Sequence, residues 1–152
     1  AGVPCEVIPG ITSAVAAPAA AGIPVTHRGM ARSFAVVTAS AAGTAHAPDA
    51  VDLGRVATAV DTLVLLMAAG KLESTCRRLI AAGRPSDEPA AIIQWATTPE
   101  ERGVIATLRE LPVLAAAAGI GPPATLIVGA VASIPAEAAA LASQLPAVTR
   151  AT

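Results

Sequence analysis

Short runs of β-branched and aliphatic residues alternate along this chain with alanine-rich stretches, and this alternation constrains the fold more than any other feature. Runs of four to six such residues, bounded by turn residues, are typical of buried strands, whereas the alanine-rich stretches are typical of helices. Strands that alternate with helices predict an α/β protein whose sheet is largely parallel and covered on both faces. The candidate strands are residues 5–8, 34–38, 62–67, 90–94, 104–107 and 125–128.

The helical stretches have recognisable start and stop signals. Between residues 71 and 82, apolar residues recur at helical spacing, charged residues occupy other positions, and Gly83 ends the pattern. The apolar positions are Leu72, Cys76, Leu79 and Ile80. Further helices are expected over residues 12–21, 112–118 and 135–143. Residues 41–50 contain glycine, proline and a lone histidine, which predicts a surface loop and the greatest local mobility of the chain.

Length and composition favour one folded domain. A chain of 152 residues with 54% hydrophobic and 14% charged residues can bury a core without disulfides or metal. Ten basic and eleven acidic residues give a net charge of -1, so the chain offers no positive field for nucleic acid. Phe34 and Trp95 are its only aromatic residues, too few for a base-stacking platform. No nucleic-acid partner is therefore expected.

Cysteine usage and hydropathy bear on the compartment. Cys5 and Cys76 show no paired spacing and the sequence has no secretory signal pattern, which indicates a reducing compartment and predicts a cytoplasmic protein. Residues 111–136 contain no charged side chain and reach the length of a membrane-spanning helix. Glycine and proline residues interrupt this stretch, so no membrane segment is expected.

The start of the chain has an unusual organisation. It opens in an apparent strand and helix, residues 5–21, and then reaches a polar, glycine-bounded segment at residues 22–29. A unit of this size is too small to have a core of its own. It therefore either packs on the rest of the chain or belongs to a domain whose beginning is absent.

Common signatures of nucleotide binding, hydrolysis and metal binding do not occur in the sequence. It has no glycine-rich phosphate loop, no nucleophile elbow and no metal-spaced set of cysteine and histidine, so no metal site is expected. Four small turns remain at the ends of predicted strands, where open α/β sheets bind ligands. Their accessible main-chain groups suit a neutral, adenosine-like ligand, although an ordinary connecting role stays open. The turns are residues 8–13, 66–70, 95–99 and 121–125.

Five sequence blocks carry a resemblance to a known family. They are Pro9-Gly10-Ile11-Thr12-Ser13, residues 21–29 (AGIPVTHRG), residues 62–67 (TLVLLM), residues 95–102 (WATTPEER) and Pro122-Pro123-Ala124. In this order they resemble the motifs of the uroporphyrinogen-III C-methyltransferases of the tetrapyrrole methylase family, over about residues 1–134. Members of this family have two α/β domains, with S-adenosylmethionine in the cleft between them.

The resemblance implies a fold and a division of the chain. Residues 1–28 correspond to the last strand and helix of the family's N-terminal domain plus a linker. Residues 29–146 correspond to the C-terminal α/β domain, a mixed five-stranded sheet flanked by helices, and residues 147–152 form a tail. The family's N-terminal glycine-rich and Gly-Gly-Asp motifs have no counterpart in this sequence. We therefore expect a partial chain, whose catalytic competence by itself is open.

The resemblance also implies binding residues. Thr12, Ser13 and Met67 match cofactor-binding positions of the family, as do Ala96, which stands where many members have glycine, and Ala124. Uroporphyrinogen carries several carboxylates, which guanidinium groups bind well. The candidate substrate-binding residues are Arg28, Arg32 and Arg102.

The function implied by the resemblance is S-adenosylmethionine-dependent C-methylation of uroporphyrinogen III to precorrin-2, in sirohaem and cobalamin biosynthesis. S-adenosylhomocysteine is the product of the cofactor, and a homodimer is expected. Methyl transfer from a sulfonium depends on alignment and desolvation, so it needs no protein nucleophile or metal. Two alternatives stay open: another tetrapyrrole methylase, and a non-catalytic, truncated chain that serves as a binding or dimerisation module.

Overall fold

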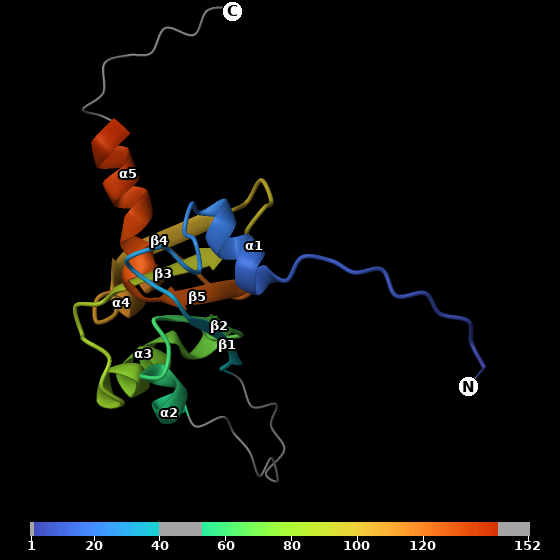
Figure 1. The fold of residues 1–152 in the computed structure, drawn as a ribbon, viewed down its shortest axis with the longest axis horizontal. Coiled ribbons are helices and arrows are strands. Elements are labelled where there is room, and N and C mark those ends of the chain that lie inside the picture. The colour runs from blue at the N-terminus through green and yellow to red at the C-terminus, as the bar shows by residue number, and fades with distance from the viewer. Residues whose placement is uncertain (1, 40–52, 143–152) are drawn as a thin grey trace, which may run out of the picture.

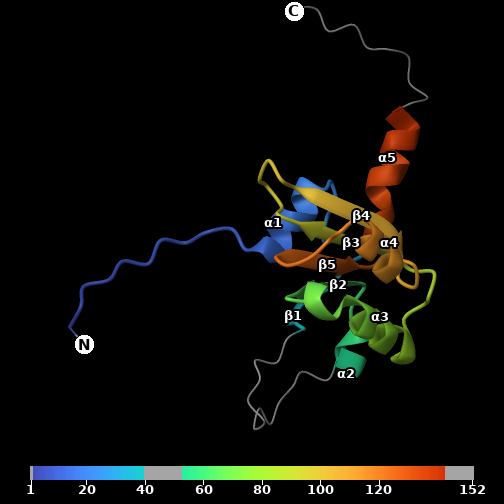
Figure 2. The same cartoon turned by 180° about the vertical axis from the view of Figure 1, so that it is seen from behind.

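A five-stranded mixed sheet with helices on both faces forms the body of the computed structural model (Figure 1, Figure 2), which describes residues 2–39 and 53–142. The strands are β1 (Phe34–Thr38), β2 (Thr62–Leu66), β3 (Pro89–Gln94), β4 (Arg102–Thr107) and β5 (Ala124–Val128). The helices are α1 (Ser13–Ala20), α2 (Leu53–Ala57), α3 (Leu72–Ala81), α4 (Leu111–Ala117) and α5 (Ile134–Ala142), with 3-10 turns η1 (Ala69–Lys71) and η2 (Ala130–Ser133).

The strand order is β1-β2-β5-β3-β4. Only β1 and β2 pair in parallel, and the other three pairs are antiparallel. The mixed five-stranded sheet is therefore confirmed, whereas the largely parallel sheet inferred from the strand pattern is wrong. The physical reason is that β2, β3 and β5 are buried on both faces, so each is a continuous apolar run whatever the direction of its neighbours.

Five of the six predicted strands form, with ends within two residues of the expected ones. The first predicted strand, residues 5–8, does not form. Val7 and Ile8 are 87% and 81% exposed, and the segment runs away from the sheet (Figure 1), where no described strand lies beside it to pair with. The four predicted helices form as α1, α3, α4 and α5, while the short α2 was not predicted. The predicted loop at residues 41–50 lies outside the described residues.

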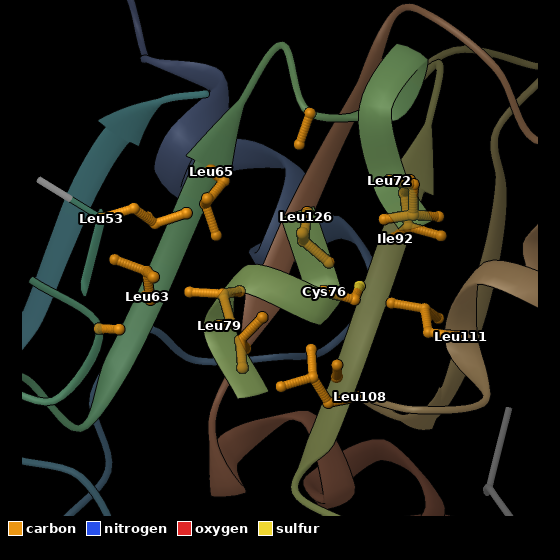
Figure 3. Close-up of a cluster of buried hydrophobic side chains, with 14 of the residues drawn as sticks. Leu53, Leu63, Leu65, Leu72, Cys76, Leu79, Ile92, Leu108, Leu111 and Leu126 are labelled. Carbon is orange, nitrogen blue, oxygen red and sulfur yellow. The ribbon is translucent and has the colours of Figure 1, made fainter. Parts of the chain in front are cut away.

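The larger core lies between the sheet and helices α2, α3 and α4. Alternate residues of the central strands, such as Leu63, Ile92 and Leu126, point to this side because successive side chains of a strand face opposite ways. They meet Cys76 and Leu79 on the apolar face of α3 (Figure 3). The apolar positions that the periodicity of residues 71–82 predicts for the helix therefore face this core.

The second core lies on the opposite face, under α1 and η2. Ala17 of α1 and Ile23 beyond its end are each 1% exposed, and they pack with Ala91, Ile127 and neighbouring residues. Thr12 caps the helix, since its Oγ1 accepts a hydrogen bond from the backbone N–H of Ala14 at 3.3 Å. The helix that follows the first predicted strand thus packs on the sheet of the rest of the chain.

Two polar clusters fasten the start of β2. The Asp61 carboxylate accepts hydrogen bonds from the backbone N–H groups of Arg32 and Ser33 and from Ser33 Oγ, at 2.8 to 3.0 Å. These bonds, the Arg32 amide first, hold the pKa of Asp61 below its ordinary value. The second cluster centres on Arg84, which is 7% exposed and pairs with Glu88 at 2.6 Å. Burial raises the pKa of Glu88, against the opposing charge of Arg84.

Within residues 2–39 and 53–142, no helix is both long and apolar enough to cross a bilayer. The uncharged stretch at residues 111–136 forms α4, β5, η2 and the start of α5 instead.

Candidate functional site

The site lies where the carboxyl ends of β1, β2 and β3 meet the amino ends of β4 and β5, and this row of strand ends is here called the cleft edge of the sheet. The register shows this directly, since Thr38 pairs with Leu66, Leu66 with Thr125, and Thr125 with Ile93. A cleft of about 460 Å³ opens at this edge. Its lining residues are Ser13, Ala17, Thr38, Leu66, Met67, Ile93, Trp95, Ala96, Thr98, Pro123, Ala124 and Thr125.

All four turns singled out from the sequence contribute to this cleft. Ser13 comes from the first turn, Met67 from the second, Ala96 from the third and Ala124 from the fourth. The turns are far apart in sequence. The second, third and fourth connect to strand ends at the same edge, whereas the first leads into α1, which packs against β2 and β5 and brings Ser13 there. This is the place where open α/β sheets generally bind ligands.

The backbone of the cleft is conformationally unusual. Met67, Trp95 and Thr97 have φ angles of 57°, 51° and 68°, in the left-handed region that residues other than glycine rarely adopt. Each such residue costs on the order of 1–3 kcal/mol, and such strain tends to cluster at functional sites. Two of the three, Met67 and Trp95, line the cleft and are 62% and 47% exposed. Two of the three strained backbone positions therefore belong to the lining of the cleft.

A network of hydrogen bonds holds the third turn in this shape. Thr98 Oγ1 donates to the Trp95 carbonyl at 2.8 Å, and the Trp95 N–H donates to the Pro123 carbonyl at 3.3 Å. The Glu101 carboxylate accepts from the Thr97 N–H at 2.6 Å, which gives this exposed amide a partner. The third and fourth turns are thereby fixed to each other.

The chemistry of the lining is apolar with a few hydroxyls. None of the twelve lining residues is charged, and Ser13, Thr38, Thr98 and Thr125 carry the hydroxyl groups. A cleft of this volume lies within the range of small-molecule sites, which are mostly apolar with a small number of polar groups. Such a lining suits the neutral nucleoside part of a ligand, and among the described residues it offers hydroxyl groups but no charged side chain to a carboxylate or an ammonium.

The structure brings together four of the five predicted cofactor-binding residues. Ser13, Met67, Ala96 and Ala124 line the cleft. Thr12 does not line it; its hydroxyl is engaged as the N-cap of α1, the helix whose first residue is Ser13. Ala17, Thr38 and Ile93 also line the cleft. All three lie on predicted elements, but no motif or composition signal marks them as site residues.

The three candidate substrate-binding arginines lie apart. Arg102 stands at the cleft edge of the sheet, where its Nη2 donates to Gln94 Oε1 at 2.8 Å and to the Gly119 carbonyl at 3.2 Å. Arg28 and Arg32 lie at the other edge, in and beside the turn that precedes β1, and both line a small surface hollow. At about 3.3 Å per strand residue, the length of β1 separates them from the cleft by roughly 20 Å of backbone.

Metal-ligating side chains do not gather in the part of the chain that the structure describes: no group of three or more His, Cys, Asp or Glu residues could hold an ion there. The cleft at the strand ends of the α/β sheet has the volume and the uncharged lining that are typical of sites for small organic ligands. Comparison with known proteins gives this class a family. The family described as Tetrapyrrole (Corrin/Porphyrin) Methylases matches residues 1–112, so the chain belongs to the tetrapyrrole methylase family.

Individual relatives agree with the family. The chain is 44% identical over 136 residues, 88% of its length, to a siroheme synthase of Nitrosospira multiformis. It is 39% identical over 86% of its length to a uroporphyrinogen-III C-methyltransferase of Priestia megaterium. A crystal structure of uroporphyrin-III C-methyl transferase from Thermus thermophilus, complexed with S-adenyl homocysteine, superposes with a TM-score of 0.69 at 39% identity and covers 88% of this chain.

The chain spans only part of these relatives. It covers 28% of the siroheme synthase, 54% of the Priestia enzyme and 56% of the Thermus chain. These relatives are therefore longer than this chain, and the chain corresponds to about half or less of each.

Proposed function

We propose that this chain is the C-terminal part of an S-adenosylmethionine-dependent methyltransferase that converts uroporphyrinogen III to precorrin-2, on the way to sirohaem and cobalamin. The observation that carries the proposal is the uncharged cleft at the strand ends, lined by Ser13, Met67, Ala96 and Ala124. The Thermus relative, of similar fold, was crystallised with S-adenyl homocysteine. A cytoplasmic location and a homodimer belong to the same proposal.

The residues of the cleft fit the nucleoside part of this cofactor. Met67 and Ile93 supply apolar surface for an adenine ring, and Thr125 can exchange hydrogen bonds with ring nitrogens or ribose hydroxyls. The Thr98 hydroxyl, which donates to the Trp95 carbonyl, can only accept one from the ligand. When bound, the cofactor supplies a methyl group activated by a sulfonium. The chain's own residues bind the nucleoside, orient it and exclude water from it, which agrees with a transfer that needs no protein nucleophile.

The charged methionine part of the cofactor needs other partners. Its ammonium and carboxylate find no charged residue among the twelve that line the cleft. We propose that a second wall, from an N-terminal domain like that of the longer relatives, supplies them. Residues 1–28 then represent the last strand and helix of that domain plus a linker, residues 29–146 the C-terminal domain and residues 147–152 a tail. The high exposure of Val3, Val7 and Ile8, 77% to 87%, supports a missing neighbour along this segment.

The tetrapyrrole carboxylates remain assigned to arginines in this proposal. Arg28 and Arg32 are exposed, and Arg102 already donates to main-chain carbonyls. Guanidinium groups bind carboxylates with two parallel hydrogen bonds, which suits a substrate with several carboxylates. We expect Arg28→Ala to weaken substrate binding more than cofactor binding. An equal loss of both affinities would count against this role.

The test is a calorimetric titration with S-adenosylhomocysteine, of the chain alone and of a chimera that joins it to the N-terminal half of the Thermus enzyme. We expect weak binding by the chain alone and tighter, saturable binding by the chimera. The chimera should also methylate uroporphyrinogen III, as measured by the mass of the product. The complete Thermus enzyme is the positive control.

Two variants of the chimera make the test specific. Met67→Ala removes most of an apolar side chain from the cleft, and we expect about a tenfold rise in the Kd for S-adenosylhomocysteine. Leu114→Ala, a matched loss of an exposed apolar side chain on α4, lies away from the cleft and should leave the Kd unchanged. If the chimera binds no S-adenosylhomocysteine, or if both variants behave alike, the cleft is not the cofactor site.

A further inference from the structure

A second concave surface lies on the opposite side of the molecule from α1, between α3 and α4. This groove measures about 710 Å³ and shares no lining residue with the cleft at the strand ends. It forms because α4 presents Ala115 and Ala116 to α3, and side chains this small leave space between the two helices. The groove is thus a consequence of the alanine-rich sequence of α4.

The walls of the groove are apolar. From α3, Leu72, Cys76 and Ile80 follow one another at i, i+4 and i+8 and form one wall. Leu108, fully buried, contributes to the groove from the segment before α4. Cys76, at 2% exposure, contributes a thiol rather than an ion, because burial raises its pKa to about 11. An apolar ligand body of drug size fits this volume.

The charge at the rim is positive. Arg77 and Glu73 line the groove and pair with each other at 3.7 Å, both largely exposed, so their charges cancel. Arg109 also lines it, and among the described residues no side chain or carbonyl accepts from its guanidinium. The nearby Glu110 carboxylate accepts from Thr107 Oγ1 at 2.7 Å instead of pairing with Arg109. Within the described residues, Arg109 is therefore a cation without a bonded partner beside an apolar groove.

From this arrangement we infer that the groove between α3 and α4 is a second binding site, which takes an amphipathic anion: an apolar body along α3 and α4 and a carboxylate on Arg109. The inference stands on the groove and its charge, and it does not depend on the cofactor site proposed above.

The probe is decanoate, titrated into the 152-residue chain at concentrations below micelle formation. Amide chemical shifts in two-dimensional NMR report where it binds. We expect saturable shifts confined to α3, α4 and the segment around Leu108. Decyltrimethylammonium, which has the same tail and the opposite charge, should bind the wild-type chain at least about tenfold more weakly, a factor of ten being the effect of one charge-assisted contact.

Three variants test the two parts of the inference. Arg109→Glu should weaken decanoate at least about tenfold and improve the binding of decyltrimethylammonium, a reversal that a non-specific apolar surface does not produce. Ala116→Leu fills the groove from an exposed position and should abolish the shifts. Ala117→Leu makes the same change one residue further along α4, outside the groove, and should leave decanoate binding intact.

Several outcomes would overturn the inference. These are shifts spread over the exposed N-terminal segment, shifts centred on the strand-end cleft, equal affinities for the two probes, or no effect of Arg109→Glu. Because Arg109 and Ala116 are both exposed, their substitution leaves the buried core unchanged, and the amide spectrum of each variant without probe checks that it folds.

Discussion

Removal of the Arg84 guanidinium should destabilise the fold more than any other single loss of charge in the described part of the chain. Its Nε donates to the Ala57 carbonyl at 2.6 Å, its Nη2 to the Val60 carbonyl at 2.8 Å and its Nη1 to the Asp61 carbonyl at 3.1 Å. Nη1 also pairs with Glu88 at 2.6 Å. Arg84→Met keeps much of the volume but leaves three carbonyls and one carboxylate without their donor.

The size of the effect follows from burial. The two side chains of the ion pair are only 6% and 14% exposed, so the carboxylate left behind stays largely out of water. Breaking a buried pair by removal of one partner costs about 3–5 kcal/mol. With a urea dependence of about 2 kcal/mol per molar, typical of a chain of this size, the midpoint should fall by about 2 M. Circular dichroism during urea titration measures it.

Two further changes separate the charge from the packing. Glu88→Gln in the Arg84→Met background should recover about 1–2 kcal/mol, because it removes the unpaired buried charge. Burial raises the pKa of Glu88, so this group stabilises the fold less as the pH rises from the ordinary glutamate value through its folded value. Loss of Arg84 removes the charge that opposes this shift and raises the pKa of Glu88 further, so the deficit of Arg84→Met should be smaller at pH 4.5 than at pH 7.5.

The control is Arg77→Ala, which removes an arginine whose pair with Glu73 is 70% and 81% exposed and should cost less than about 1 kcal/mol. If Arg84→Met shifts the urea midpoint no more than Arg77→Ala, or if its deficit is the same at both pH values, then the argument from buried charge is refuted.

Other predictions follow from the same structure. Asp61→Ala should remove the bonds to Arg32 and Ser33 and abolish part of the loss of stability in acid. The lowered pKa of Asp61 stabilises the fold at pH values above the ordinary aspartate pKa, and this contribution is lost as the pH falls toward the folded pKa. Urea midpoints at pH 3 and pH 7 test this. Burial raises the pKa of Cys76 to about 11, so this thiol should react far more slowly with a thiol reagent than exposed Cys5. For the same reason wild-type stability should fall between about pH 9 and pH 11, and Cys76→Val should remove this dependence of stability on pH. Gly129→Ala should cost at least about 2 kcal/mol, because φ is 147° there and an added Cβ would stand 2.8 Å from the Asp61 carbonyl oxygen. Gly121→Ala is the control, since the nearest atom to its added Cβ is 3.9 Å away, and it should be close to neutral in thermal denaturation.

Sequence reasoning located best those cleft residues that lie in turns, because a turn is recognisable from a few consecutive residues. The turn residues around Met67, Ala96 and Ala124 were singled out by composition and by position at strand ends, and the structure gathers them round one cleft. Thr38 and Ile93 carried no such signal, because each belongs to a strand and reaches the cleft only through pairing with its neighbours. The roles of these residues toward a cofactor stay predictions.

Element positions were determined by the sequence itself. The spacing of Leu72, Cys76 and Leu79 placed α3 within about a residue, and the β-branched runs placed β1 to β5, because periodicity and turn residues act over a few neighbouring positions. Tertiary structure decided the rest: the insertion of β5 between β2 and β3, the failure of residues 5–8 to form a strand, and the separation of Arg28 from Arg102. Strand order, direction and the distance between two side chains depend on pairings between residues far apart along the chain. An apolar run has the same pattern whichever strand it pairs with, so only the folded sheet shows which strands are neighbours and in which direction they run.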